Sequence, residues 1–206
     1  MKNGLFIRVP KSASSSILCA LDNHTLHSAK RASNQSDKKG PTVFYVRTNN
    51  TINVIEKFNS EIDLKKFFTF GFVRNPWDRA VSSWKFGSHT GKEWNCTFNK
   101  FCHKLKTLNL NPETAENSLI LHAAEQHPFL LNKKLNLKVD FVGRFENLEE
   151  DLAIICDKIG IRHREIPYKN KSSHKHYTEY YDDKTRSLIA EKYAKDIEYF
   201  GYKFGG

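Results

Sequence analysis

Residues 67–84 read FFTFGFVRNPWDRAVSSW, and they carry the strongest structural signal in this chain. The run from Phe67 to Val73 is almost wholly apolar, which is typical of a strand buried on both faces of a parallel sheet. Pro76 suits the first turn of a helix. That helix would carry on one face Trp77, Ala80, Val81 and Trp84. The stretch therefore predicts a buried strand that leads through Arg74 into a helix.

Strand-like and helix-like segments alternate along the rest of the chain. Further strands are expected at residues 5–9, 42–47 and 139–142. Further helices are expected to start within the serines after Lys11 and to cover residues 52–58, 113–125, 148–159 and 182–200. Residues 87–112 show no clear pattern. The alternation predicts a single α/β domain over residues 1–206, with a mostly parallel central sheet flanked by helices in three layers.

Composition restricts the possible partners without naming one. Of the 206 residues, 33 are Lys or Arg and 23 are Asp or Glu, so the formal charge is +10 and an anionic partner is expected. No nucleic-acid-binding motif occurs, so nucleic acid is not expected as a partner. No apolar run reaches the roughly 20 residues that span a membrane, and no signal peptide precedes the first strand. These observations predict a soluble, cytoplasmic protein.

Metal and disulfide signals are weak. No His/Cys cluster has the spacing of a zinc site, so no metal is expected. Cys96 and Cys102 share one polar segment, and whether they pair is left open.

Residues 10–16 read PKSASSS and follow the first expected strand. A strand, a short turn and a helix together aim backbone N–H groups at one point, which suits a phosphate-like anion. Lys11 adds positive charge there. The Walker pattern GxxxxGK[ST] is absent, which disfavours a nucleotide kinase. The alternative is a serine-rich helix cap beside an exposed lysine.

Arg74 and Ser82 form a second candidate site. The arginine ends the buried strand, and the serine lies almost two turns into the helix that follows. A guanidinium fork matches phosphate oxygens, and a hydroxyl adds a neutral donor. In the alternative interpretation, Arg74, Asp78 and Arg79 form ion pairs on the surface of a capped helix.

The two motifs together, PKxxxxS and RNPxDRxxS, resemble the PAPS-dependent sulfotransferases, where PAPS is 3′-phosphoadenosine 5′-phosphosulfate. The likeness is greater to the carbohydrate branch, which includes glycosaminoglycan sulfotransferases. Residues 139–148 (VDFVGRFENL), 169–174 (KNKSSH) and 196–202 (DIEYFGY) are similar to elements of that branch, in the same order.

The resemblance implies a P-loop-like fold and an enzyme that moves the sulfuryl group of PAPS in line to an acceptor hydroxyl, on a carbohydrate that can be anionic. The residues that it assigns to the 5′-phosphosulfate loop are Lys11, Ser12, Ala13, Ser14, Ser15 and Ser16. It assigns Arg74 and Ser82 to the 3′-phosphate and gives Lys11 the catalytic role of stabilising the departing phosphate. A basic loop near Lys171 and Ser172 would cover the donor.

The chain departs from the family pattern at two places. The loop commonly has glycine or threonine where this chain has Ser14 and Ser15, so glycine's freedom at positive φ is lost. Several relatives have a histidine after the second strand, but residues 45–50 read YVRTNN. Arg47 would suit an acidic acceptor instead. His24 and His122 are weak candidates for the general base. The alternative function is a non-catalytic module that binds anions or glycans and retains the fold.

Overall fold

The strands form one parallel sheet. A computed structural model describes residues 2–21, 25–26, 41–46, 51, 63–89, 94–115, 117–166 and 175–206. The strands are β1 (Asn3–Ile7), β2 (Thr25–Leu26), β3 (Val43–Val46), β4 (Phe67–Val73) and β5 (Phe141–Arg144). Their order across the sheet is β2-β3-β1-β4-β5, and each neighbouring pair is parallel. The predicted α/β class with a parallel sheet is confirmed.

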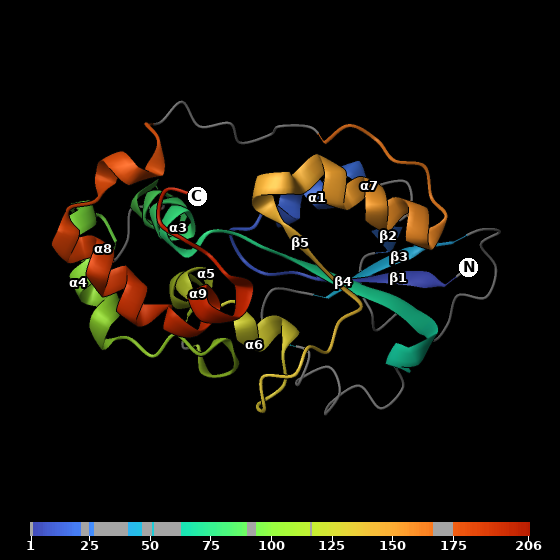
Figure 1. Ribbon diagram of the computed structural model, residues 1–206, viewed down its shortest axis with the longest axis horizontal. Helices are drawn as coiled ribbons and strands as arrows, with labels where there is room; N and C mark the ends of the chain where they lie inside the picture. Colours follow the sequence, from blue (N-terminus) through green and yellow to red (C-terminus); the bar gives the residue numbers. More distant parts are fainter. Residues whose placement is uncertain are drawn as a thin grey trace.

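Side chains alternate between the two faces of the sheet, as the pleat of a strand requires. Phe6 and Phe70 stack at 5.2 Å on the face that α1 (Ser14–Ala20) and α7 (Leu148–Ile159) cover. Leu5 and Ile7 point to the opposite face, which packs against the residues of α6 (His127–Leu130). Helices therefore lie on both faces, and Figure 1 shows α1 and α7 together above the sheet with α6 below it.

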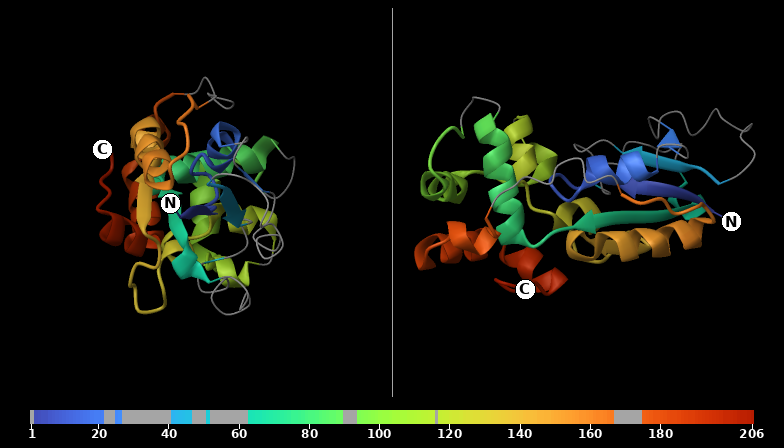
Figure 2. Two further views of the ribbon diagram at one scale, coloured as in Figure 1. Left: turned by 90° about the vertical axis from the view of Figure 1, so that its right-hand side faces the viewer. Right: turned by 90° about the horizontal axis from the view of Figure 1, so that it is seen from above.

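The remaining helices gather beyond the carboxyl ends of the strands, at one end of the long axis (Figures 1 and 2). They are α3 (Pro76–His89), α4 (Phe98–Thr107), α5 (Ser118–Ala123), α8 (Asp183–Lys192) and α9 (Ala194–Phe200). Short 3₁₀ turns lie at η3 (Leu64–Lys66), η4 (Pro112–Thr114), η5 (Phe145–Asn147) and η6 (Tyr177–Tyr180). These helices cover the edge of the sheet that the carboxyl ends of the strands form. Residues 10–16 and Arg74 lie at this edge.

Several predicted elements have different bounds in the structure. The strand expected at residues 139–142 begins two residues later, at Phe141. The helix expected over 113–125 is divided into η4 and α5, because Asn117 caps a new helix with its side chain. The helix expected over 182–200 is divided at Tyr193 into α8 and α9. The helix expected at 52–58 lies outside the described residues.

The helices α4 and α6 were not expected, and α4 is the longer of the two. Thr97 caps α4, whose buried side chains Phe98, Phe101, Cys102 and Leu105 have helical spacing. Cys102 is buried and Cys96 half-buried, and both are free thiols. Burial raises the pKa of Cys102 to about 12. Among the described residues, no helix has both the length and the apolar character to cross a membrane.

Candidate functional site

The strand order reverses between β1 and β4. After β1 the chain runs to β2 and β3 on one side, and then returns to β4 and β5 on the other. In open α/β sheets, ligands bind outside the carboxyl ends of the strands at such a reversal. β1 leads through Arg8 and Val9 into the loop of residues 10–16, and β4 is followed directly by Arg74. Both candidate motifs therefore lie at the position where this fold binds ligands.

The loop of residues 10–16 adopts an unusual backbone conformation. Lys11 and Ala13 have φ angles of 65° and 62°, in the left-handed region that non-glycine residues rarely occupy. Ser14 and Ser15 are helical, so the positive φ values fall outside the positions where the family has glycine. Left-handed residues next to a helix turn successive N–H groups toward one side, which is a geometry that suits anions.

The serine hydroxyls hold this loop in shape. Ser12 and Ser14 are buried and donate to the carbonyl of Val9 at 2.8 and 2.7 Å. The helix begins within the serines, at Ser14, as expected. Its N-cap is Ala13, which makes no side-chain hydrogen bond, so the alternative of a serine cap is wrong. Ser15 is exposed and Ser16 half-buried at the start of the helix.

Arg74 joins the two motifs directly. Its Nη1 donates to the carbonyl of Lys11 at 3.3 Å, and its Nε donates to Asp78 at 2.7 Å. The guanidinium lies 3.9 Å from the centre of the ring of Phe145, the first residue of η5, which directly follows β5. The Arg74–Asp78 ion pair considered from the sequence is present, with both side chains largely buried rather than on the surface.

The helix α3 presents one face to the loop. Arg79 is 1% exposed, and it donates from Nη1 to the carbonyl of Pro10 and from Nη2 to that of Ala124. Its Nε is buried without a partner. Ser82 lies one turn further on, half-buried, with Phe86 one turn beyond it. The surface ion pair considered for Arg79 is wrong, because this arginine is a buried support of the loop.

Lys11 and His122 share the Phe86 ring. The Lys11 ammonium lies 4.4 Å from the ring centre, and the His122 ring lies at the same centre-to-centre distance. Burial, followed by the positive charges of Arg74 and Arg79, lowers the pKa of Lys11 to about 8. A cation that other cations surround stabilises a bound anion, because the anion relieves their repulsion.

His122 has a defined tautomer. Its Nδ1 lies within hydrogen-bonding distance of the Ser118 carbonyl, so this nitrogen donates and Nε2 keeps its lone pair. Burial lowers the pKa of His122; the hydrogen bond to Ser118 opposes this, and the positive charges of Lys11, Arg79 and Arg8 add to the lowering. The histidine is therefore neutral at neutral pH and able to accept a proton.

Arg8 is a further cation that the sequence reasoning missed. It follows β1, and its guanidinium lies 5.5 Å from the centre of the Tyr45 ring on β3. Its Nε is buried and has no hydrogen-bond partner. Arg8 thus leans toward β3, whereas Arg74 follows β4 on the other side of β1. A guanidinium at the carboxyl end of β1 adds positive charge to the edge of the sheet that carries Lys11 and Arg74.

Some sequence candidates are not tested by the geometry. His24, Arg47, Lys171 and Ser172 lie outside the described residues. Within the part of the chain that the structure describes, no group of three or more His, Cys, Asp or Glu side chains has the geometry of a metal site.

The geometry defines a parallel α/β protein with a cationic site at the strand-order reversal. The sequence model of the Sulfotransferase family matches residues 2–203. An uncharacterized protein of Archaeoglobus fulgidus is 32% identical over 97 residues, which cover 46% of this chain and 69% of that protein. A crystal structure of a sulfotransferase from Alicyclobacillus acidocaldarius has a TM-score of 0.58 and 16% identity, with 97% of this chain and 94% of that chain covered.

The chain therefore belongs to the sulfotransferase family. The structural neighbour, at its low identity, supports the P-loop-like fold expected from the sequence. Membership of the family makes the chain a transferase of sulfuryl groups.

Proposed function

We propose that this sulfotransferase uses PAPS as its donor and transfers the sulfuryl group to a hydroxyl of a carbohydrate. The observation that carries the proposal is the hydrogen bond from Arg74 to the Lys11 carbonyl, which unites the two motifs. The residues fit a multiply charged anion, since Lys11 lies near the positive charges of Arg74 and Arg79, with the Phe86 ring against its ammonium.

The donor-binding roles follow from position. The N–H groups of residues 11–16 and the Lys11 ammonium hold the 5′-phosphosulfate. Arg74 has further N–H groups beyond those bonded to Asp78 and Lys11, and these bind the 3′-phosphate together with Ser82. When bound, PAPS supplies a sulfuryl group on a phosphate that leaves readily.

His122 is the general base of the proposed reaction. Its Nε2 accepts the proton of the acceptor hydroxyl while the oxygen forms a bond to sulfur and the bond from sulfur to the phosphate oxygen breaks. Lys11 stabilises the negative charge that develops on the leaving phosphate. Both groups lie against Phe86, and this shared contact supports the pairing of the two roles.

Arg8 gives the acceptor site a preference. Because its guanidinium lies toward Tyr45 of β3, and β4 is on the other side of β1, we assign Arg8 to an anionic group of the acceptor. This supports a carbohydrate that carries a carboxylate or sulfate.

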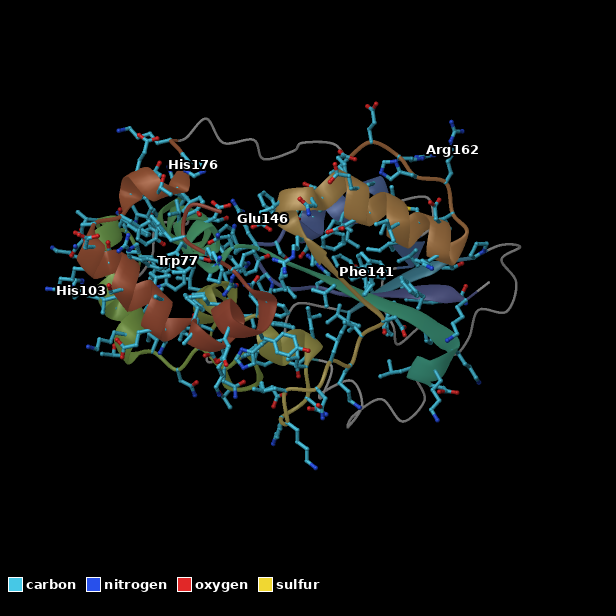
Figure 3. All side chains as sticks on the ribbon, viewed as in Figure 1. Trp77, His103, Phe141, Glu146, Arg162 and His176 are labelled. Atoms are coloured by element: carbon cyan, nitrogen blue, oxygen red, sulfur yellow. The ribbon has the colours of Figure 1, made fainter. Side chains whose placement is uncertain are left out.

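Two measurements test the proposed function. Thermal unfolding with 3′-phosphoadenosine 5′-phosphate should show a larger stabilisation than with AMP or ATP, and Arg74→Ala should remove the difference. Arg162→Ala is the matched control, because Figure 3 shows Arg162 far from Trp77, at the other end of the long axis. Equal stabilisation by the three nucleotides would contradict the donor assignment.

Transfer itself is measured with labelled PAPS and a panel of neutral and acidic glycans. Label in a glycan supports the enzyme, and acidic glycans should be the better acceptors. Nucleotide or glycan binding without transfer would favour the non-catalytic module.

A further inference from the structure

A buried glutamine holds the backbone of Arg74. The Arg74 N–H donates to Gln126 Oε1 at 2.9 Å, and Gln126 Nε2 donates to the Arg74 carbonyl at 2.9 Å. The side-chain amide thus satisfies both backbone groups of the first residue after β4, as a neighbouring strand would. Gln126 has no exposed surface, so water does not compete for these bonds.

Asp196 of α9 holds the glutamine in turn. Its carboxylate accepts from the backbone N–H groups of Gln126 and His127, each at 2.8 Å. His127 Nδ1 lies 2.8 Å from the same carboxylate and donates to it. Asp196 is fully buried, and three donors compensate its charge. These hydrogen bonds therefore hold Gln126, His127 and Asp196 in a defined arrangement.

The peptide between Arg74 and Asn75 is also held through its N–H group. The Asn75 N–H donates to Glu146 Oε1 at 2.6 Å, and its side chain donates to the carbonyl of Lys203 at 2.9 Å. Figure 3 shows Glu146 between Trp77 on the helical side and Phe141 on the sheet. Two networks consequently hold the backbone at Arg74, and among the described residues Gln126 is the side chain that bonds both the Arg74 N–H and its carbonyl.

We propose that Gln126 and Asp196 are positioning residues that set the selectivity of this enzyme for a 3′-phosphorylated nucleotide. The proposal rests on the proposed function, in which Arg74 binds the 3′-phosphate. Neither residue needs to touch the nucleotide, because both act through the Arg74 backbone. A guanidinium fork binds phosphate well only within a narrow range of geometry, so a small displacement of the backbone lowers the affinity.

The test compares two ligands that differ by the 3′-phosphate alone. The dissociation constants of AMP and of 3′-phosphoadenosine 5′-phosphate are measured by calorimetry for the full chain and its variants. The dissociation constant of AMP divided by that of the bisphosphate measures how much the 3′-phosphate adds to binding. Gln126→Leu should reduce this ratio about tenfold, the scale of one charged hydrogen bond, and leave AMP binding within about twofold.

Asp196→Asn should reduce the same ratio, because the amide keeps the shape of the carboxylate but lacks one acceptor oxygen. Asp196 acts through Gln126, so the two substitutions should not be independent. The fold reduction of the ratio in the double variant should be smaller than the product of the two single reductions. Thr69→Val is the matched control: this buried residue of β4 donates to Asp140 at 2.9 Å at the other end of the strand. The control should lower stability and keep the ratio.

The outcomes separate the two proposals. Arg74→Ala serves as the reference, and it should reduce the ratio at least as much as Gln126→Leu. If Arg74→Ala leaves the ratio unchanged, the assignment of the 3′-phosphate to Arg74 fails and the positioning role falls with it. If Arg74→Ala reduces the ratio but both network variants keep it, only the positioning role is wrong. Equal losses for AMP and the bisphosphate, in either network variant, would show a structural role alone.

Discussion

Measuring nucleotide affinity between pH 7 and pH 9 tests the site at its most sensitive group, Lys11. Burial and the neighbouring charges of Arg74 and Arg79 lower the pKa of this lysine to about 8. Lys11 is then about nine-tenths protonated at pH 7 and about one-tenth protonated at pH 9. A phosphate bound beside the ammonium raises the pKa again, so binding at pH 9 requires the uptake of a proton.

The size of the effect follows from these fractions. If the protonated form binds, the dissociation constant of 3′-phosphoadenosine 5′-phosphate should rise about tenfold from pH 7 to pH 9, or about 1.4 kcal/mol. The ligand contributes little, because the second pKa of a phosphate monoester is about 6. Lys11→Arg keeps the positive charge over this range and should give a nearly constant affinity. Lys11→Met should bind weakly at both pH values.

Calorimetry in two buffers of different ionisation enthalpy measures the proton uptake directly. Close to one proton should be taken up at pH 9, and about a tenth of a proton at pH 7. A dissociation constant that stays level from pH 7 to pH 9 would refute the reasoning. The same tenfold rise in Lys11→Arg would also refute it, because the titrating group would then be another residue.

Three further substitutions have defined outcomes. Arg79→Met should lower the free energy of unfolding by about 3 kcal/mol in urea, because two buried carbonyls lose their donor, and a loss under about 0.5 kcal/mol would contradict this. His122→Gln should reduce kcat at least about 100-fold. The same substitution should remove the acidic limb from the pH profile of kcat/KM. In the unchanged protein this limb should lie below the ordinary histidine pKa, because burial lowers the pKa of His122. A limb that persists in the variant would exclude His122 as the base. Gly160→Ala should lower stability by about 1 kcal/mol by thermal unfolding, because φ is 80° at this helix end, and an unchanged Tm would contradict the strain.

Elements with strong local signals were predicted well. β4 and α7 have the expected bounds. The long apolar run of β4 and the amphipathic pattern of α7, which ends at Gly160, both show in consecutive residues which side chains will be buried. For α4 the local signal lies in its cap, Thr97, and in its apolar spacing, within a segment that is otherwise polar. The division at Tyr193 has no such signal, because the helical stripe continues through it while its hydroxyl reaches the carbonyl of Ala123 at 2.6 Å.

The candidate site was predicted in outline. Parallel strands bring their carboxyl ends to one edge, so the proximity of Lys11 and Arg74 could be expected from two strand–helix motifs. The conformations within the loop could not, because Ser12 and Ser14 bond to a carbonyl rather than cap the helix. Arg79 looked like a surface charge, since its position in a polar motif does not show that it is buried.

The amino-acid sequence was sufficient for the class of fold and the family, because both depend on motifs whose residues are neighbours in the chain. The supports of these motifs depend on the tertiary structure. Gln126 lies 52 positions from Arg74, and Asp196 lies 70 positions from Gln126. Their hydrogen bonds exist because folding buries three distant segments together, and no local pattern records which buried polar group will meet which.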